Sequence, residues 1–365
     1  MESAEITISL CMIVRNEEAT IARCLDSVKD IPDEIVIVDT GSMDRTKEIV
    51  FQYADKVYDF EWIDDFAAAR NFAFSKATQD YILWLDADDI LVEPDREQLL
   101  ALKRNLDPLM DAVNMPYLLA FDEFGNVTFS LRRNRLVKRS KNFRWVGAVH
   151  EYLEVFGHVL NADISVTHKG SRENDYGRNL RIYEARLAKG EVFSPRDLYY
   201  FANELYDHRL TNRAIEYYQR FLATGQGWVE DKIAACGKLA DSFQYLNEKD
   251  KELQYMFKSF EYDIPRAEFC CRIGHYFLQA GNYGQAAFWY KLATQLDKPL
   301  DNWGPMIEAC WTWLPHIQLC VCYDRLAKYE LAYEHNEMAR KFRPDDPQVL
   351  HNKKYLEGVL GLGQD

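Results

Sequence analysis

Residues 81–90, with the sequence YILWLDADDI, place three carboxylates directly after a strongly apolar run. The apolar part is typical of a strand buried on both faces of a parallel sheet. Because an uncompensated carboxylate is costly to bury, we expect Asp86, Asp88 and Asp89 to lie where the strand ends at a cleft, with a divalent cation between them. The same acids would also suit a solvated turn that caps the following helix. The segment alone does not decide between a cation site and a cap.

Three more apolar segments precede this one, and helical patterns separate them. Strands are predicted at residues 6–14, 34–39 and 56–60, and helices at residues 19–28, 44–50 and 67–77. This alternation indicates right-handed crossover connections and a mainly parallel α/β sheet.

Polar residues follow the strands at the edge where a parallel sheet binds its ligands. Arg15, Asn16 and Glu17 follow the first strand, and Asp39 ends the second. An acid in the position of Asp39 can accept hydrogen bonds from a ribose or a base, although it would also suit a turn cap. No GxGxxG pattern follows the first strand, which argues against an ordinary dinucleotide site.

Three ordered motifs resemble the inverting GT-A glycosyltransferases of family 2: SLCMIVRNEEATIARCLDSV, EIVIVDTGSMDRT and DDFAAARNFAFSKATQDYILWLDADD. The resemblance covers about residues 6–184 and implies a Rossmann-like GT-A domain with a mainly parallel sheet. It implies that Asp39 holds the uridine of a UDP-sugar, and that Asp86 and Asp88 bind the ribose and a Mn²⁺ or Mg²⁺ ion. The donor-binding residues expected on this basis are Arg15, Asn16, Glu17, Asp39, Arg70, Asp86, Ala87, Asp88 and Arg178.

The segment WVGAVHE at residues 145–151 resembles the W-x-G-x-V-H-E motif of family-2 enzymes that glycosylate saccharides or peptides. An inverting transfer needs a base that takes a proton from the acceptor. Position in the motif makes Glu151 the first candidate for this base and His150 the second. A half-exposed strand with a structural histidine would give the same pattern. His168, at the end of a strand predicted at residues 164–168, is expected to join Asp86 and Asp88 as a metal ligand, to contact the diphosphate, or to be structural.

Basic residues gather between residues 132 and 144 and again at Lys169, Arg172 and Arg178. The first group suits either a diphosphate or acidic acceptor, or a solvated hairpin between strands predicted at residues 113–121 and 127–131. The second group would neutralise the departing UDP when its loop closes.

Aromatic-rich amphipathic helices without strand patterns fill the second half of the chain. Helix pairs with small residues at their contacts resemble tetratricopeptide repeats over about residues 194–359. We therefore predict a GT-A domain at residues 1–190 and an all-α, tetratricopeptide-like domain at residues 191–365. Such arrays have a concave face, which would bind a peptide acceptor or mediate homodimerisation.

Composition excludes several other classes. The formal net charge of −14 argues against a nucleic-acid binder. The eight cysteines lack metal-ligand spacing, which favours free thiols in a reducing compartment. No apolar run reaches about 18 residues, and the acidic N-terminus does not resemble a signal peptide. We therefore expect a cytoplasmic protein without a membrane span.

The predicted function is transfer of a hexose from a UDP-sugar, by a single displacement with inversion, to a cysteine or serine of a peptide. The order of domains resembles that of bacteriocin peptide S-glycosyltransferases of the sublancin type. Two alternatives remain open: a saccharide-directed glucosyltransferase of the lipopolysaccharide-core type, and a catalytically silent repeat scaffold.

Overall fold

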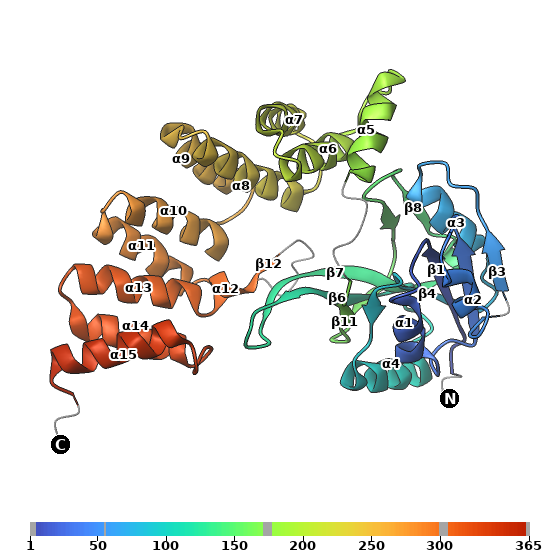
Figure 1. The fold of residues 1–365 in the computed structure, drawn as a ribbon, viewed down its shortest axis with the longest axis horizontal. Coiled ribbons are helices and arrows are strands. Elements are labelled where there is room, and N and C mark those ends of the chain that lie inside the picture. The colour runs from blue at the N-terminus through green and yellow to red at the C-terminus, as the bar shows by residue number, and fades with distance from the viewer. Residues whose placement is uncertain (1–4, 55, 171–176, 299–305, 363–365) are drawn as a thin grey trace. The chain divides into compact units, whose positions relative to one another are not determined.

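The computed structural model describes residues 5–54, 56–170, 177–298 and 306–362, and Figure 1 labels its elements. The chain forms two compact units. The first unit contains Met1–Ala120 and Ser130–Val192, and the second contains Phe121–Phe129 and Phe193–Asp365.

A mixed sheet forms the centre of the first unit. Its strand order is β3-β2-β1-β4-β7-β6-β11-β5, and β10 pairs with β6. Strands β1 to β4 run parallel, whereas β7 runs antiparallel to β4. The expected GT-A-like, mainly parallel sheet is therefore confirmed. The strands of the mixed sheet in this unit are β1 (Ile8–Val14), β2 (Glu34–Asp39), β3 (Lys56–Asp59), β4 (Tyr81–Trp84), β5 (Asp89–Ile90), β6 (Ala112–Phe121), β7 (Val127–Lys138), β10 (Val159–Asn161) and β11 (Val166–His168). Strands β8 (Arg144–Val146) and β9 (Tyr152–Glu154) form a separate two-stranded antiparallel sheet.

The strand register brings the polar segments to one edge of this sheet. Val14 at the end of β1 pairs with Asp39 at the end of β2. Trp84 of β4 pairs with Cys11 of β1, so the chain continues from Trp84 towards Asp86 at the same edge. This arrangement follows from the parallel crossovers that the alternating pattern predicted.

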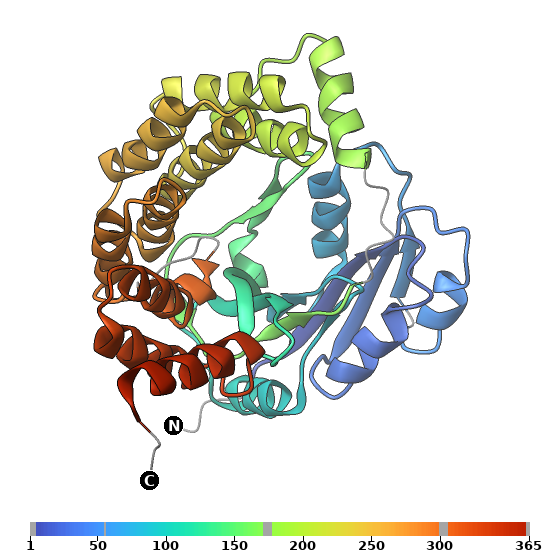
Figure 2. The same ribbon diagram turned by 60° about the vertical axis from the view of Figure 1, so that its left-hand side comes forward.

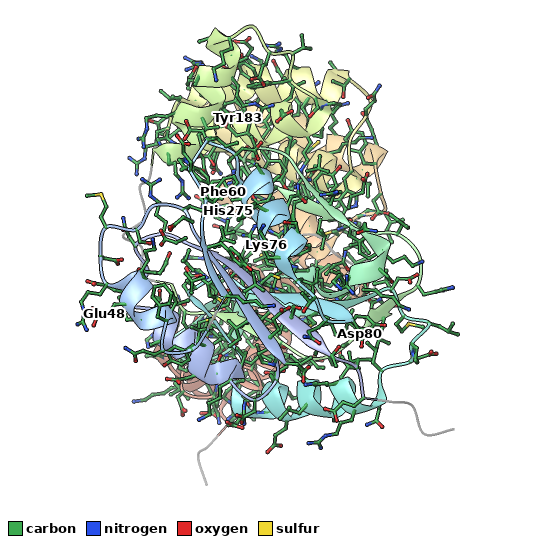
Figure 3. All side chains as sticks on the ribbon, turned by 90° about the vertical axis from the view of Figure 1, so that its right-hand side faces the viewer. Glu48, Phe60, Lys76, Asp80, Tyr183 and His275 are labelled. Atoms are coloured by element: carbon green, nitrogen blue, oxygen red, sulfur yellow. The ribbon has the colours of Figure 1, made fainter. Side chains whose placement is uncertain are left out.

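Two apolar layers cover the sheet. Residues of α1, α2 and α4 pack on one face, in a core that includes Leu25, Val50 and Leu99. Helix α3 packs on the other face together with β8 and β9, whose contributions include Trp145 and Leu153. Figure 3 labels Lys76 in the last turn of α3. The helices of this unit are α1 (Ile21–Val28), α2 (Thr46–Val50), α3 (Phe66–Lys76), α4 (Glu93–Asn105) and α5 (Arg178–Ala188), with a 3₁₀ turn at Arg139–Lys141.

Successive helix pairs build the second unit, as Figure 2 shows. Small residues let the helices of a pair approach closely: a Cβ on Gly274 of α10 would lie 3.0 Å from the ring of Tyr290 on α11. The predicted tetratricopeptide-like helical domain is confirmed, although it is not purely α-helical because the two-residue strand β12 also lies in it. Its elements are α6 (Pro195–Asp207), α7 (Thr211–Ala223), α8 (Val229–Tyr245), α9 (Lys249–Lys258), a 3₁₀ turn at Ser259–Glu261, α10 (Ala267–Gln279), α11 (Tyr283–Ala293), β12 (Met306–Ile307), α12 (Glu308–Trp311), α13 (Leu314–Arg325), α14 (Tyr329–Arg340) and α15 (Pro347–Leu360).

The tip of the β6–β7 hairpin belongs to the second unit. The Arg343 guanidinium lies 4.6 Å from the ring centre of Phe124 and 4.3 Å from that of Trp313. It also lies 2.6 Å from the carboxylate of Glu123. A guanidinium between two aromatic faces is a favourable cation–π arrangement, and it fixes the tip to the repeats.

Several boundaries differ from the sequence-based expectations. The strand expected at residues 127–131 continues to Lys138, so much of the basic run lies in β7. The segment at residues 81–90 divides into β4 and β5 around the acids. All eight cysteines are buried and carry free thiols. Among the described helices, none combines the length and apolarity needed to cross a bilayer.

Candidate active site

A pocket of about 370 Å³ opens at the carboxyl edge of the sheet, within the first unit. It brings together most of the residues predicted from the motifs. Asn16 and Asp39 are the predicted residues that do not line it, although Thr40, next to Asp39, does. The predicted residues in its lining are Arg15, Glu17, Arg70, Asp86, Ala87, Asp88, His150, Glu151, His168 and Arg178.

Arg70 connects two acids that lie far apart in the sequence. Its Nε donates to Glu151 Oε1 at 2.6 Å, and its Nη2 donates to Asp86 Oδ1 at 2.7 Å. The guanidinium lies between the rings of Trp84 and Trp145, 5.0 and 4.8 Å from their centres. Helix α3 thereby holds both carboxylates at one wall of the pocket.

The neighbouring carboxylates keep the Arg70 guanidinium charged. Burial alone would lower the pKa of Arg70, but the carboxylates of Asp86 and Glu151 outweigh it and raise the pKa. For the acid Asp86, burial has the opposite effect and would raise the pKa. The positive charges of Arg70 and Arg135 outweigh burial and hold the pKa of Asp86 below its usual value. A charged acid persists in a buried site when a cation of this kind accompanies it.

The loop that carries His150 and Glu151 has an unusual backbone. Gly147 adopts φ +100° and His150 adopts φ +51°. A non-glycine residue in the left-handed region stores strain, which the surrounding contacts must hold in place. One such contact is the hydrogen bond from the Phe66 backbone N–H to the Ala148 carbonyl at 2.9 Å, which fixes the loop to the start of α3.

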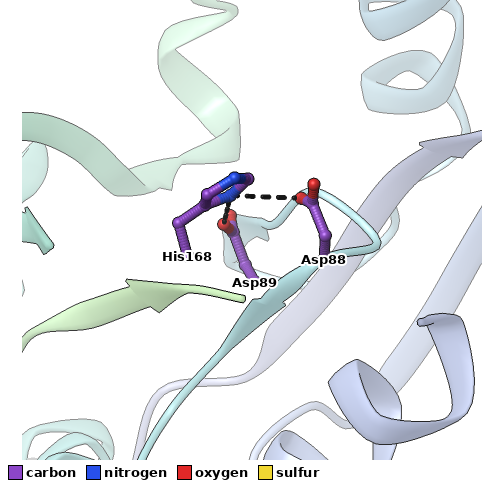
Figure 4. Close-up of side chains that lie close together, drawn as sticks. All are labelled: Asp88, Asp89 and His168. Atoms are coloured by element: carbon purple, nitrogen blue, oxygen red, sulfur yellow. Dashed lines mark ion pairs between the residues drawn. The ribbon is translucent and has the colours of Figure 1, made fainter. Parts of the chain in front are cut away.

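Asp88, Asp89 and His168 form a compact cluster on another part of the strand edge (Figure 4). His168 Nδ1 lies 3.5 Å from Asp88 Oδ1 and 3.8 Å from Asp89 Oδ1. One ligand atom from each residue falls within 4.8 Å of the others. Hydrogen bonds to Asp88 and Asp89 raise the pKa of His168 to about 10, against the opposing effect of burial.

Asp89 has a structural environment that sets it apart from Asp88. It is fully buried, and its Oδ2 lies 3.0 Å from Nη2 of the equally buried Arg135. Tyr117 donates its hydroxyl to Asp89 Oδ1 at 2.7 Å, and the Asp86 backbone N–H donates to Oδ2 at 3.1 Å. Both oxygens of Asp89 are therefore occupied by protein groups, whereas Asp88 is partly exposed.

The cluster fits a divalent cation such as Mn²⁺ or Mg²⁺. Carboxylate oxygen and imidazole nitrogen are suitable donors for such ions. The contacts of His168 Nδ1 with the acids leave the other ring nitrogen, Nε2, for a metal, a common arrangement of metal-binding histidines. Asp86, expected from the motif to share this ion, is instead paired with Arg70. The structure thus brings Asp88 and His168 together with Asp89, rather than with Asp86.

The remaining predicted residues divide into turn-forming and pocket-lining groups. Asp39 is buried, and its Oδ1 accepts from the backbone N–H groups of Gly41 and Ser42, both at 3.0 Å. Asn16 Oδ1 accepts from the Met43 N–H at 2.7 Å, which joins the loops after β1 and β2. Arg178 begins α5, and its guanidinium lies 4.6 Å from the Phe66 ring centre. Arg172 lies outside the described residues.

Several residues of the pocket were not predicted from the sequence. Arg133 of β7 lines it, but the sequence offered only an undivided basic run. Other members of that run have structural partners: Arg135 pairs with Asp89, and Lys141 pairs with Asp111. The aromatic wall includes Phe66, Trp84 and Trp145 of the quoted motifs, although the motifs assigned these residues no role. Its members are Trp62, Phe66, Trp84, Tyr117 and Trp145.

Comparison with known proteins agrees with the motifs. Residues 9–117 match the family model described as Glycosyl transferase family 2. A TPR repeat-containing protein of Synechococcus elongatus is 40% identical over 152 residues, which cover 42% of this chain and 36% of that protein.

Two other relatives are named as glycosyltransferases. The SPbeta prophage-derived glycosyltransferase SunS of Bacillus subtilis is 29% identical over 227 residues, covering 59% of this chain and 53% of the relative. The lipopolysaccharide core biosynthesis glycosyltransferase LpsC of Rhizobium meliloti is 30% identical over 165 residues, covering 43% and 61%. The chain thus spans less than two thirds of the length of these relatives. The resemblance predicted from the motifs is therefore confirmed, and residues 9–117 are the part of the chain that matches glycosyltransferase family 2.

Proposed function

We propose that this chain is a metal-dependent inverting glycosyltransferase that moves a hexose from a UDP-sugar to a cysteine or serine side chain of a peptide. The observation that carries the proposal is that a single pocket contains both the Asp88–His168 cluster and Glu151, the candidate base. A sugar nucleotide held at the cluster would then present its anomeric carbon within the same pocket as the base.

The donor half of the site is supported by Asp39 at the end of β2. Its Oδ2 is buried, with no hydrogen-bond partner among the described residues. A buried acceptor atom of this kind usually has a partner in the functional state. In the proposed complex, the uridine of the donor supplies the missing donor group.

The diphosphate half of the site is assigned to Asp88 and His168. A bound Mn²⁺ or Mg²⁺ would offset the negative charge that develops on the departing diphosphate. Arg133 and Arg178 also line the pocket and add positive charge on the protein's side. Asp86, with Arg70 fixing its orientation, is left to bind the ribose of the donor.

The acceptor half of the site centres on Glu151. Its Oε1 accepts from Arg70, and Oε2 accepts from none of the described residues. We assign Oε2 as the atom that takes the acceptor's proton. As the acceptor oxygen or sulfur bonds to the anomeric carbon, the bond from that carbon to the diphosphate oxygen breaks, and UDP departs with the electron pair. His150, in its strained backbone conformation beside Glu151, is proposed to orient the acceptor.

The repeat unit is proposed to supply the acceptor specificity. The combination of a family-2 domain with tetratricopeptide-like repeats favours a peptide acceptor. The similarity to the glycosyltransferase SunS agrees with the resemblance to sublancin-type enzymes on which this proposal is based. The similarity to LpsC keeps a saccharide acceptor as the second candidate. The concave face of the repeats would also suit a second copy of the chain.

The decisive experiment incubates the protein with UDP-glucose and Mn²⁺, together with a cysteine- and serine-containing peptide library and, separately, a saccharide panel. Mass spectrometry should show peptides that gain one hexose. Hexose on saccharides alone would move the assignment to the second candidate. If neither hydrolysis nor transfer occurs, and UDP gives no heat of binding in calorimetry, the proposed enzyme is refuted in favour of a silent scaffold.

A further inference from the structure

We infer that Gly170 is a positioning residue of the cation site, because the space between Asp88 Oδ2 and His168 Nε2 exists only while residue 170 has no side chain. The inference rests on the proposed function, which assigns a cation to this cluster. Gly170 lies outside the recognised motifs, and its position identifies Asp88 Oδ2 and His168 Nε2 as the ligand atoms.

A side chain at residue 170 would occupy the space between Asp88 and His168. A Cβ built on Gly170 would lie 2.5 Å from Asp88 Oδ2 and 2.7 Å from both Nε2 and Cε1 of His168. Real Cβ atoms essentially never approach other heavy atoms this closely. The Cβ direction of Gly170 therefore points between one carboxylate oxygen and one imidazole nitrogen.

Backbone conformation does not explain a glycine at this position. The φ angle of Gly170 lies outside the left-handed range, in contrast to Gly147 at φ +100°. An alanine could adopt the backbone of Gly170 without strain, so the constraint is one of space. The atoms that would be displaced belong to the two side chains of the proposed cation site.

The distances agree with a cation in this space. Mn²⁺ and Mg²⁺ hold their oxygen and nitrogen ligands at roughly 2.0–2.3 Å. The Cβ point of Gly170 falls within a few tenths of an ångström of that distance from both candidate ligand atoms. A methyl group there would compete with the ion for the same position.

The other contacts of His168 support Nε2 as its ligand atom. The Tyr117 hydroxyl lies 3.1 Å from Nδ1, on the side where Asp88 Oδ1 and Asp89 Oδ1 also lie. Since the oxygens of Asp89 are occupied by Tyr117, Arg135 and a backbone N–H, Asp89 orients His168 and is not a ligand. Asp88 Oδ2 and His168 Nε2 then remain as the protein ligands.

The backbone beside Gly170 is fixed in position. The Lys169 N–H donates to the Asp88 carbonyl at 2.8 Å, and Arg23 Nη2 donates to the Lys169 carbonyl at 2.7 Å. These two hydrogen bonds prevent the segment from withdrawing to admit a side chain. The strain of a substitution would instead move the side-chain ends of Asp88 and His168, which spoils the ligand geometry and leaves the fold intact.

The test compares wild-type protein with Gly170→Ala and with Gly284→Ala as a matched control. Gly284 lies in α11, has ordinary φ, and has no heavy atom within 4 Å of its built Cβ. Mn²⁺ binding is measured without a sugar nucleotide, by the electron paramagnetic resonance signal of free Mn²⁺ and by calorimetry. We expect Gly170→Ala to weaken Mn²⁺ binding at least tenfold at an unchanged melting temperature, and Gly284→Ala to bind as wild type does.

A double-mutant cycle with His168→Ala distinguishes loss of ligand geometry from a remote effect. Once His168 is absent, Gly170→Ala should cost much less Mn²⁺ affinity than in the wild-type background. Equal Mn²⁺ binding by wild type and Gly170→Ala would overturn the inference alone. A large fall in melting temperature would also overturn it, because Gly170 would then be required for packing. Wild-type protein that binds no Mn²⁺ would refute the metal dependence of the proposed function and the inference with it.

Discussion

Arg70 Nε and Glu151 Oε1 lie 2.6 Å apart, although α3 and the loop after β8 are distant in the sequence. The same guanidinium donates to Asp86 Oδ1 at 2.7 Å. One buried cation therefore links the proposed ribose-binding acid to the proposed base. This geometry explains how the chain accommodates two acidic side chains beside an aromatic wall, where each acid alone would be costly.

Replacing Glu151 by Gln should remove the proposed base while keeping an oxygen that accepts from Arg70. We expect the turnover number for hexose transfer to fall about 10²–10⁴-fold, the usual contribution of a positioned base, while the dissociation constant for UDP stays within a few-fold of wild type. Steady-state kinetics and calorimetry would measure the two quantities. Glu154→Gln, at an exposed position of β9, is the control. Lost UDP binding would reassign Glu151 to the donor site.

Replacing Arg70 by Lys should destabilise the first unit. A single ammonium group cannot reproduce the two directed hydrogen bonds or the position between two indole rings. Leaving one partly buried carboxylate without its partner should lower the free energy of unfolding by about 1–3 kcal/mol. Because Trp84 and Trp145 flank Arg70, their fluorescence during urea unfolding would report the change. Arg45→Lys, which alters an exposed pair with Glu48, should unfold as wild type does.

Asp88 and Asp89 are adjacent and chemically identical, yet replacing Asp88 by Asn should affect metal binding, whereas replacing Asp89 by Asn should affect stability. Asp88→Asn should abolish the metal dependence of UDP binding with little effect on stability, because Asp88 and its ion-pair partner His168 are both partly exposed. Asp89→Asn should lower the free energy of unfolding by about 3–5 kcal/mol, since it leaves the buried charge of Arg135 uncompensated. Calorimetry with and without Mn²⁺, and urea unfolding, would separate the two. Metal dependence that survives in Asp88→Asn would remove Asp88 from the ligands.

Much of the first unit was predictable because buried parallel strands have continuous apolar runs and because the parallel crossovers bring their carboxyl ends together. The pocket-lining positions of Asp88, His150, Glu151 and His168 follow from that rule together with the motifs. The partner of each acid was not predictable. Asp86 forms an ion pair with Arg70 of α3, and Asp89 forms one with Arg135 of β7. Both pairs depend on how α3 and β7 pack against the strand edge.

The second unit was predictable as helix pairs, because small residues recur at helical spacing where two helices approach. Its inclusion of the hairpin tip was not. The tip sequence DEFGN reads as a turn, and nothing in it signals that Arg343 will lie against Phe124. Contacts between segments this far apart in the chain depend on tertiary packing, which no local pattern encodes.

Replacing Arg343 by Ala should release the hairpin tip within the second unit. The substitution removes the cation–π contacts with Phe124 and Trp313 and the ion pair with Glu123. We expect amide hydrogen exchange at residues 121–129 to accelerate at least tenfold, while exchange in α7 is unchanged. Arg340→Ala, which alters a pair with Glu337 inside α14, serves as the control. Unchanged exchange at the tip would show that other contacts hold it.

A pair of histidines should make the second unit sensitive to acid. His316 Nδ1 of α13 lies 2.9 Å from His335 Nδ1 of α14, and burial lowers the pKa of both, that of His316 to about 4, with further repulsion from His335 and Lys341. Because the folded pKa of His316 lies below the unfolded value of about 6.5, its protonation favours unfolding. This contribution to stability is complete above about pH 6.5 and is lost as the pH falls towards about 4.

Between pH 7 and pH 5 the free energy of unfolding of the second unit should therefore fall by about 2 kcal/mol from this group. His316→Gln should flatten the dependence in urea unfolding measured across that range. His275, an exposed histidine of α10 labelled in Figure 3, provides the matched control, and His275→Gln should keep the wild-type slope. An identical slope in His316→Gln and wild type would contradict this prediction. A partly buried imidazole whose pKa is lowered on folding must make the free energy of unfolding depend on pH in this range.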